Sequence, residues 1–299
     1  MNAGEFELLL SAAQTHDALV EVVAAYFGAH ELFYGHGTDC AEGEAGWLLG
    51  AVLDWDEGRW AAQPQADDVT RIAAIAQQRV NERVPLGYLL GEGWFAGLRF
   101  EISRQVLVPR SPFAEVIEHA FEPWIGLAEG DRLLDIGTGS GCIAIAAAVH
   151  LPGVLVDATD VSVDALGLAT RNVQTHHVAD RVELFEADMY PQNDRRYRVI
   201  MTNPPYVPSR RIRELPPEYH HEPVLGLDGG EDGLRFVRQI LANARARLVP
   251  DGALFVEVGE ADTELESAFP RLPLTWLEFD HGGSGVFVIN AEQLAEAGF

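Results

Sequence analysis

After Asp131 the chain alternates short apolar runs with segments of helical length and period, and this pattern limits the fold more than any other feature. Such runs are typical of buried parallel strands, which are apolar on both faces. Strands that alternate with helices form a parallel sheet with helices on both faces. We therefore predict an α/β fold with a doubly wound, mostly parallel sheet. The predicted strands are RLLDI, VLVDATD, VELFEAD, YRVIMTN and ALFVEV, at residues 132–136, 154–160, 182–188, 197–203 and 253–258.

The end of the chain has a different pattern. The runs LTWLEFD and GVFVIN follow one another with only HGGS between them. A connection this short joins antiparallel strands and cannot make a parallel crossover. We therefore expect the sheet to end in an antiparallel pair.

The sequence divides into three regions, of which the last contains this sheet. Apolar residues recur at helical spacing at 5–27 and 67–83, which predicts a small helical domain at residues 1–84. Residues 85–110 mix glycines and aromatics with short alternating runs and are expected to form a hairpin linker. The remaining residues, 111–299, form the α/β domain. Its first helix is expected to open at Ser111-Pro112, with the serine hydroxyl as N-cap.

The charge balance restricts the partners of the protein. Its 21 basic residues, all arginine, stand against 46 acids, for a net charge of −25. Such a surface repels phosphate backbones and favours a basic partner, because nucleic-acid affinity rests largely on cations that neutralise phosphates. The first 58 residues hold 11 acids and no Lys or Arg. We expect a basic partner to dock at this end and expect no nucleic-acid specificity.

Membrane, secretion and metal signals are missing from the sequence. There is no apolar run of membrane-spanning length, and the N-terminal segment MNAGEFELLLSAAQ carries acids where a secretory signal carries bases. Cys40 and Cys142 lie far apart and lack metal-ligand spacing. We expect a soluble cytoplasmic protein with no membrane partner, no metal site and no disulfide.

A glycine-rich loop follows the first predicted strand and precedes the helical segment CIAIAAAV. Open α/β sheets bind ligands at this carboxyl end of their strands. Glycines let a ligand approach the backbone, and the N-terminus of the next helix offers free N–H groups to a carboxylate. The candidate cofactor-binding residues of the loop are Gly137, Thr138, Gly139, Ser140 and Gly141.

Acidic residues end the next two strands. Asp160 closes the second strand, where a carboxylate accepts both hydroxyl protons of a ribose. To this point the pattern fits a nicotinamide nucleotide or S-adenosylmethionine equally well. Asp188 and Met189 close the third strand and are candidates to contact the edge and face of an adenine, although Asp188 also fits an ordinary strand-end cap.

The fourth strand leads into Asn203-Pro204-Pro205-Tyr206, a motif that no dehydrogenase needs. Two prolines make a rigid loop with carbonyls free to accept hydrogen bonds. The Asn203 side-chain oxygen and the Pro204 carbonyl can each accept one hydrogen of a planar NH2 group, while the Tyr206 ring lies against its plane. An amide nitrogen is a poor nucleophile, so acceptors that fit its pyramidal, more positive attacking form favour the transition state. We therefore predict methylation of an amide-type nitrogen at this loop, with no dedicated general base.

With these motifs on one sheet edge, the chain resembles the glutamine side-chain amide methyltransferases, which act on peptide chain release factors or on a ribosomal protein. The resemblance spans nearly the whole chain. It implies a helical N-terminal substrate-binding domain and a Rossmann-like class I methyltransferase domain with seven strands, the last one antiparallel. It also implies that S-adenosylmethionine is the cofactor and S-adenosylhomocysteine the product. The cofactor residues that it implies are the glycine loop, Asp160, Met189 and Asn203, and the loop from Asn203 to Tyr206 grips the substrate glutamine.

Three other segments resemble the branch that acts on ribosomal protein L-three of the large subunit, in support of ribosome assembly. They are LVPRSPFAEVI, HEPVLGLDGGEDGL and TWLEFDHGGSGVFVINAEQL. In the release factor branch the first segment usually reads Ile-Pro-Arg-Pro-Asp-Thr-Glu, and Ser111-Pro112 departs from that pattern. The resemblance therefore implies ribosomal protein L-three as the protein substrate, free or in an assembly intermediate.

Three alternatives stay open. The same chemistry can serve the glutamine of peptide chain release factors. A nucleic-acid amino methyltransferase also grips a planar NH2 group, but it needs a basic groove and usually flips its base, and a net charge of −25 argues against it. A non-catalytic assembly chaperone would use the fold for binding alone.

Overall fold

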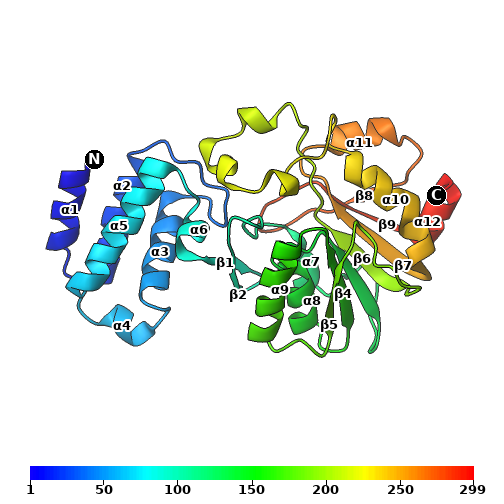
Figure 1. Cartoon of the computed structure of the whole chain (residues 1–299), viewed down its shortest axis with the longest axis horizontal. Coiled ribbons are helices and arrows are strands. Elements are labelled where there is room, and N and C mark those ends of the chain that lie inside the picture. Colours follow the sequence, from blue (N-terminus) through cyan, green and yellow to red (C-terminus); the bar gives the residue numbers. More distant parts are fainter. The chain divides into compact units, whose positions relative to one another are not determined.

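The computed structural model describes residues 1–299, and the chain forms two compact units (Figure 1). The first unit contains Met1–Glu92 together with Pro216–His221, and the second contains Gly93–Leu215 and Glu222–Phe299. The first unit thus extends beyond the helical region expected at residues 1–84. It also takes up a short segment that follows the Asn-Pro-Pro-Tyr loop in sequence, which the sequence patterns did not indicate.

The first unit is helical. Its α1 and α2 begin at N-caps, Asn2 and Thr15, whose side chains accept from backbone N–H groups of the first turn. Phe6 of α1 stacks on Tyr26 of α2, with ring centroids 3.9 Å apart, within a buried apolar core. The helices are α1 (Ala3–Ala12), α2 (His16–Gly28), α3 (Ala41–Val52), α4 (Glu57–Ala61), α5 (Ala66–Glu82) and α6 (Leu86–Leu90).

Buried charges fix the returning segment in this unit. Glu218, in the 3₁₀ helix η2 (Pro217–His221), is fully buried and accepts from the Phe33 N–H at 3.0 Å, Arg79 at 3.1 Å and Arg83 at 2.7 Å. Arg79 is 1% exposed and also donates to Glu44 at 2.9 Å. Burial raises the pKa of Glu44; at Glu218 burial acts in the same direction, but the hydrogen bonds outweigh it and the pKa is lowered. Each charge therefore depends on its partners to stay ionised in the core.

The second unit contains the predicted doubly wound sheet, in the order β5-β4-β3-β6-β7-β9-β8. Neighbours from β5 to β7 are parallel, and β9 runs antiparallel between β7 and β8. The prediction of a mostly parallel α/β sheet with an antiparallel last strand is therefore confirmed. The strands are β3 (Arg132–Ile136), β4 (Leu155–Asp160), β5 (Val182–Glu186), β6 (Tyr197–Thr202), β7 (Leu248–Glu257), β8 (Thr275–Trp276) and β9 (Val286–Asn290).

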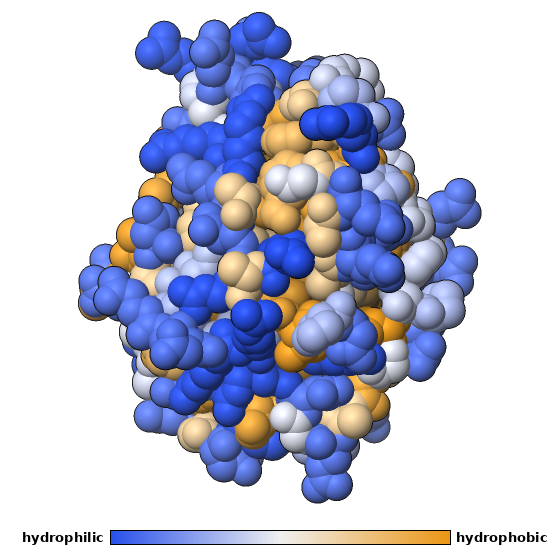
Figure 2. All heavy atoms as spheres, turned by 90° about the vertical axis from the view of Figure 1, so that its right-hand side faces the viewer, coloured by the Kyte–Doolittle hydropathy of each residue, from blue (hydrophilic) through white to orange (hydrophobic).

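Helices cover both faces of this sheet (Figure 1). One face packs against α8 (Cys142–His150) and α9 (Val163–Thr175), and α7 (Phe113–Glu118) packs against α8. The other packs against α10 (Arg235–Arg247), α11 (Asp262–Ala268) and α12 (Ala291–Ala297), which share a buried apolar cluster with β3, β6, β7 and β9. Figure 2 shows that hydrophilic residues cover most of the face that carries α12, with a narrow band of apolar residues among them.

Smaller elements complete the chain. The strands β1 (Glu92–Phe95) and β2 (Leu98–Glu101) pair in a two-stranded sheet inside the expected linker, after helix α6. Three-residue 3₁₀ helices, η1 (Ile212–Glu214) and η3 (Val224–Gly226), flank the segment of η2. None of the helices combines the length and the apolar character that crossing a membrane requires.

The buried charge cluster predicts a large effect of Arg79→Met. This change leaves Glu44 buried without its cation, which costs about 3–5 kcal/mol, and it leaves Glu218 with Arg83 as its one remaining arginine partner. Hydrogen exchange of the α5 amides, read by mass spectrometry, should therefore show a lower opening free energy. Arg71→Met on the same helix is the control, because Arg71 is exposed. Equal exchange in the two variants would contradict the role given to the cluster.

Candidate active site

The strand register places four chain segments at one edge of the sheet. Ile136 of β3 pairs with Thr159 of β4 and with Thr202 of β6, and Thr202 pairs with Val256 of β7. The residues that follow these partners therefore lie side by side at the carboxyl ends of the strands. In sheet order they are Asp160, Gly137, Asn203 and Glu257. The structure thus brings together three residues predicted from different motifs and adds a fourth, Glu257.

The glycine loop makes a tight turn between β3 and α8. Gly137, Gly139 and Gly141 have φ of +74°, +56° and +82°, a region that favours glycine. The N–H groups of Gly137 and Thr138 both donate to the Thr159 carbonyl at 2.9 Å, which ties the loop to β4. A Cβ added to Gly137 would meet no atom within 4 Å, so this part of the backbone is open to approach.

Asp160 is held by the same loop. One carboxylate oxygen accepts from the Gly139 N–H at 2.9 Å, and the other accepts from the Ser162 N–H at 2.8 Å. Burial raises the pKa of Asp160, while the backbone donors of Ser162 and Gly139 oppose the shift. The carboxylate is therefore oriented by the backbone of its two neighbouring loops.

A second buried carboxyl, Asp135, lies inside the turn. It accepts from the Thr138 hydroxyl at 2.6 Å. Burial raises its pKa to about 7, with a smaller rise from the charge of Asp160, and the hydrogen bond from Thr138 acts in the opposite direction. Sequence analysis did not single out Asp135, because an acid within RLLDI reads as part of the strand.

The segment after β5 turns sharply. β5 ends at Glu186, two residues before Asp188, which is exposed. Met189 has a φ of +73°, and its carbonyl accepts from the Thr159 hydroxyl at 2.6 Å. Its side chain is half-buried against the core of the sheet. The turn is therefore held at the β4 end, next to Asp160.

The Asn-Pro-Pro-Tyr loop leaves β6 at Asn203. Asn203 is half-buried and Pro204 is buried. Beyond Tyr206 the chain runs beside a second loop, because the Val207 N–H donates to the Leu227 carbonyl and the Gly229 N–H donates to the Val207 carbonyl, each at 2.9 Å. The loop is therefore fixed at both ends, by the sheet and by this backbone pairing.

Sequence reasoning missed the polar residues behind this loop. The Tyr206 hydroxyl donates to Glu257 at 3.2 Å, and the Ser111 hydroxyl donates to the same carboxyl at 2.5 Å. The one available signal was a carboxylate in the apolar strand ALFVEV. The expected helix start was one residue too early, since α7 begins at Phe113 with Pro112 as its N-cap. The Ser111 hydroxyl oxygen still accepts from the Phe113 N–H at 3.2 Å, while its proton is donated to Glu257.

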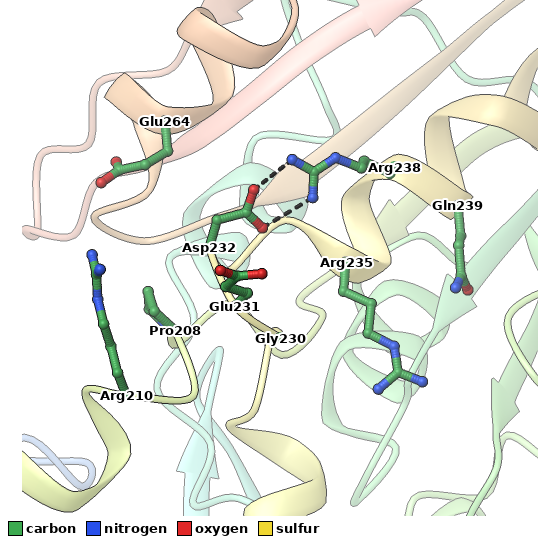
Figure 3. A pocket seen from close by; sticks show the side chains of 9 residues that line it. All are labelled: Pro208, Arg210, Gly230, Glu231, Asp232, Arg235, Arg238, Gln239 and Glu264. Carbon is green, nitrogen blue, oxygen red and sulfur yellow. Dashed lines mark hydrogen bonds and ion pairs between the residues drawn. The ribbon is translucent and has the colours of Figure 1, made fainter.

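A separate cavity of about 690 Å³ lies beyond Tyr206 in the second unit (Figure 3). Figure 3 shows Asp232 joined to Arg238 by two hydrogen bonds on one wall. No residue predicted to bind the cofactor or the amide lines it. The lining residues are Pro208, Arg210, Gly230, Glu231, Asp232, Arg235, Arg238, Gln239 and Glu264. Its arginines and acids are equal in number, so it does not indicate a ligand of one charge.

Comparison with known proteins gives the class. A family model described as the methyltransferase small domain matches residues 119–214. The crystal structure of the hMettl16 catalytic domain in complex with MAT2A 3′UTR hairpin 6 has a TM-score of 0.51 and 19% identity, over 75% of this chain and 81% of that one. Identity this low shows the fold alone. Together with the sheet order and the glycine loop, these findings define a class I methyltransferase with a Rossmann-like fold.

The curated relatives give the family. The ribosomal protein uL3 glutamine methyltransferase of Xanthomonas campestris pv. campestris is 43% identical over 92% of this chain and 91% of its own length. The enzyme of the same name from Neisseria meningitidis serogroup B is 39% identical over 92% and 93%. The chain belongs to the family of ribosomal protein uL3 glutamine methyltransferases, the family that its motifs resemble. It is therefore an enzyme that transfers methyl groups.

The raised pKa of Asp135 predicts a pH-dependent stability. Because the folded pKa, about 7, lies above the ordinary value of 3.8, the protonated form is favoured by folding. This contribution is complete below about pH 4 and is lost as the pH rises through 7. The thermal midpoint of the wild type should therefore fall more between pH 5 and pH 8 than that of Asp135→Asn, which keeps an acceptor for Thr138. An equal fall of the thermal midpoint in both proteins would show that Asp135 is not the source of this pH dependence.

Proposed function

We propose that the protein transfers a methyl group from S-adenosylmethionine to the side-chain amide nitrogen of a glutamine in ribosomal protein uL3, the large-subunit protein L-three. One observation carries the proposal. Asn203, which opens the acceptor loop Asn203-Pro204-Pro205-Tyr206, is next in register to Gly137 of the glycine loop. This arrangement brings a loop suited to a planar NH2 group beside a loop suited to an adenosyl cofactor.

The residues of the sheet edge fit this cofactor. Asp160 has its carboxylate oriented by two backbone donors and is the proposed partner of the ribose hydroxyls. The glycine loop, with open space beside Gly137, is proposed to take the methionine carboxylate. Asp188 and Met189 are proposed to contact the adenine, and Asn203 is proposed to contact the methionine end of the cofactor. When bound, the cofactor supplies an electrophilic methyl group on a sulfonium.

The acceptor loop prepares the amide nitrogen. The Asn203 side-chain oxygen and the Pro204 carbonyl accept its two hydrogens, and the rigid prolines hold both acceptors in place. These bonds strengthen as the nitrogen becomes pyramidal and positive, so they stabilise the transition state more than the bound substrate. Tyr206 closes one face of the amide. Transfer of the methyl group leaves the amide nitrogen positively charged with both its hydrogens, and this cation is acidic enough to lose one proton to water, so no dedicated base is required.

The acidic surface suits this substrate. Ribosomal proteins are basic, and a net charge of −25 attracts them electrostatically. The first unit carries acids without Lys or Arg over residues 1–58, so we propose that it binds the substrate protein. The enzyme is proposed to act on uL3 in the cytoplasm, either on the free protein or within an assembly intermediate. A release factor is the alternative acceptor with the same chemistry.

Methyl transfer to isolated proteins tests the acceptor. Labelled S-adenosylmethionine should label newly made uL3 and leave a release factor unlabelled. Asn203→Ala should lose nearly all transfer, because one of the two acceptors for the amide is gone. Asn243→Ala is the control, since Asn243 is exposed on α10. Label on the release factor alone would overturn the substrate, and label on RNA or DNA alone would overturn the amide chemistry.

Cofactor affinity tests the sheet edge separately. Asp160→Asn replaces the charged acceptor of the ribose hydroxyls, so calorimetry should show S-adenosylmethionine binding about tenfold or more weaker, the range for a hydrogen bond to a charged group. The exposed Asp164→Asn, on the next helix, should bind as the wild type does. Unchanged affinity in Asp160→Asn would remove this carboxylate from the cofactor site.

A further inference from the structure

The Tyr206 side chain is held by groups that the proposed reaction does not itself use. Its hydroxyl donates to one carboxyl oxygen of Glu257, at 3.2 Å. Its ring lies against Gly259, where an added Cβ would be 2.5 Å from the ring carbon Cε2. Gly259 has a φ of +53°, so both its conformation and its contact with the ring favour glycine.

Glu257 is in turn fixed by a segment distant in sequence. Its second carboxyl oxygen accepts from the Ser111 hydroxyl at 2.5 Å, and Ser111 accepts from the Phe113 N–H at 3.2 Å. Glu257 is 5% exposed and Ser111 is 8% exposed. Each carboxyl oxygen therefore has one hydroxyl donor, in a site that water hardly reaches.

The backbone of Tyr206 is confined as well. A Cβ added to Gly229 would lie 2.7 Å from the Tyr206 Cα, and one added to Gly233 would overlap the Tyr206 carbonyl oxygen. Glu257 itself ends β7, in register with Asn203 at the end of β6. The ring is thus held at its hydroxyl, at its face and at its backbone, beside the residue that grips the amide.

We propose that Glu257 is a positioning residue for methyl transfer: it holds the Tyr206 phenol so that the ring closes one face of the bound amide. Ser111 fixes the second oxygen of Glu257 and so fixes the direction of the first. Glu257 acts through Tyr206 and touches neither cofactor nor substrate. The inference rests on the proposed function, because it gives Tyr206 a face of the substrate amide to close.

The ionisation of Glu257 follows from the same geometry. Both oxygens accept hydrogen bonds, which suits the carboxylate; a protonated carboxyl would turn one oxygen into a donor and displace one hydroxyl. Burial raises the pKa to about 7, while the bonds from Ser111 and Tyr206 and the charge of Arg110 oppose the rise. Arg110 is itself paired with Glu222, at 2.6 and 2.8 Å, and β9 contributes the apolar Val286 opposite Glu257.

A double-mutant cycle on the full-length enzyme tests the proposal. Glu257→Gln keeps one side-chain acceptor but cannot accept hydrogen bonds from both hydroxyls. The kcat for methylation of the protein substrate should therefore fall about tenfold or more, as for a lost bond to a charged group. The affinity for S-adenosylmethionine should stay within about twofold, because Glu257 does not contact it. Tyr206→Phe should lose kcat similarly, and adding Glu257→Gln to it should cost little more.

The pH profile supplies a second readout. The wild type should lose kcat as the pH falls below 7, and this limb should be missing in Glu257→Gln and in Tyr206→Phe. Independent, multiplying losses in the cycle, or an unchanged limb in both variants, would overturn the positioning role. A kcat in Glu257→Gln equal to that of the wild type would overturn the positioning role and leave the proposed function intact. A wild-type enzyme that methylates no glutamine would overturn the proposed function, and this inference with it.

Discussion

The parallel pairing of β3 with β4 and with β6 is the constraint on which the site depends. Because the register matches Ile136 with both Thr159 and Thr202, three loops leave the sheet at one level. The hydroxyl of Thr202 donates to the Ile136 carbonyl at 2.9 Å, which ties the ends of the two strands together. A shift of this register would separate the glycine loop from the acceptor loop, although each motif would be intact.

The same edge concentrates acids that are buried or half-buried. Asp135, Asp160 and Glu257 each have a pKa raised by burial, and each is held by hydroxyl or backbone donors. These donors orient each carboxyl and lower its pKa against the effect of burial, so they favour the charged form at this edge. The first unit uses buried charge differently, because Arg79 and Arg83 are paired there with Glu218, and these pairs hold a segment of chain in place.

The sequence was informative wherever the pattern was local. Strands alternating with helices predicted the sheet, and a glycine loop, an acid and Asn203 at successive strand ends predicted one edge. The rest depends on pairs far apart in sequence. Ser111 and Glu257 are 146 residues apart, and Arg79 and Glu218 are 139 apart, so no local period links them. Ser111 illustrates the same limit: its bond to the nearby Phe113 N–H lies at the expected helix start, whereas its bond to Glu257 has no local signature in the sequence.

The central claim is that this chain modifies a glutamine amide of uL3. Fragment mass spectrometry of uL3 purified from cells with and without the gene tests it most directly. The account predicts one additional methyl group, located on the side chain of a glutamine, in uL3 from cells that contain the gene and none in uL3 from cells that lack it or carry only Asn203→Ala. Identical uL3 in both kinds of cell, or a methyl group that persists without the gene, would contradict the account.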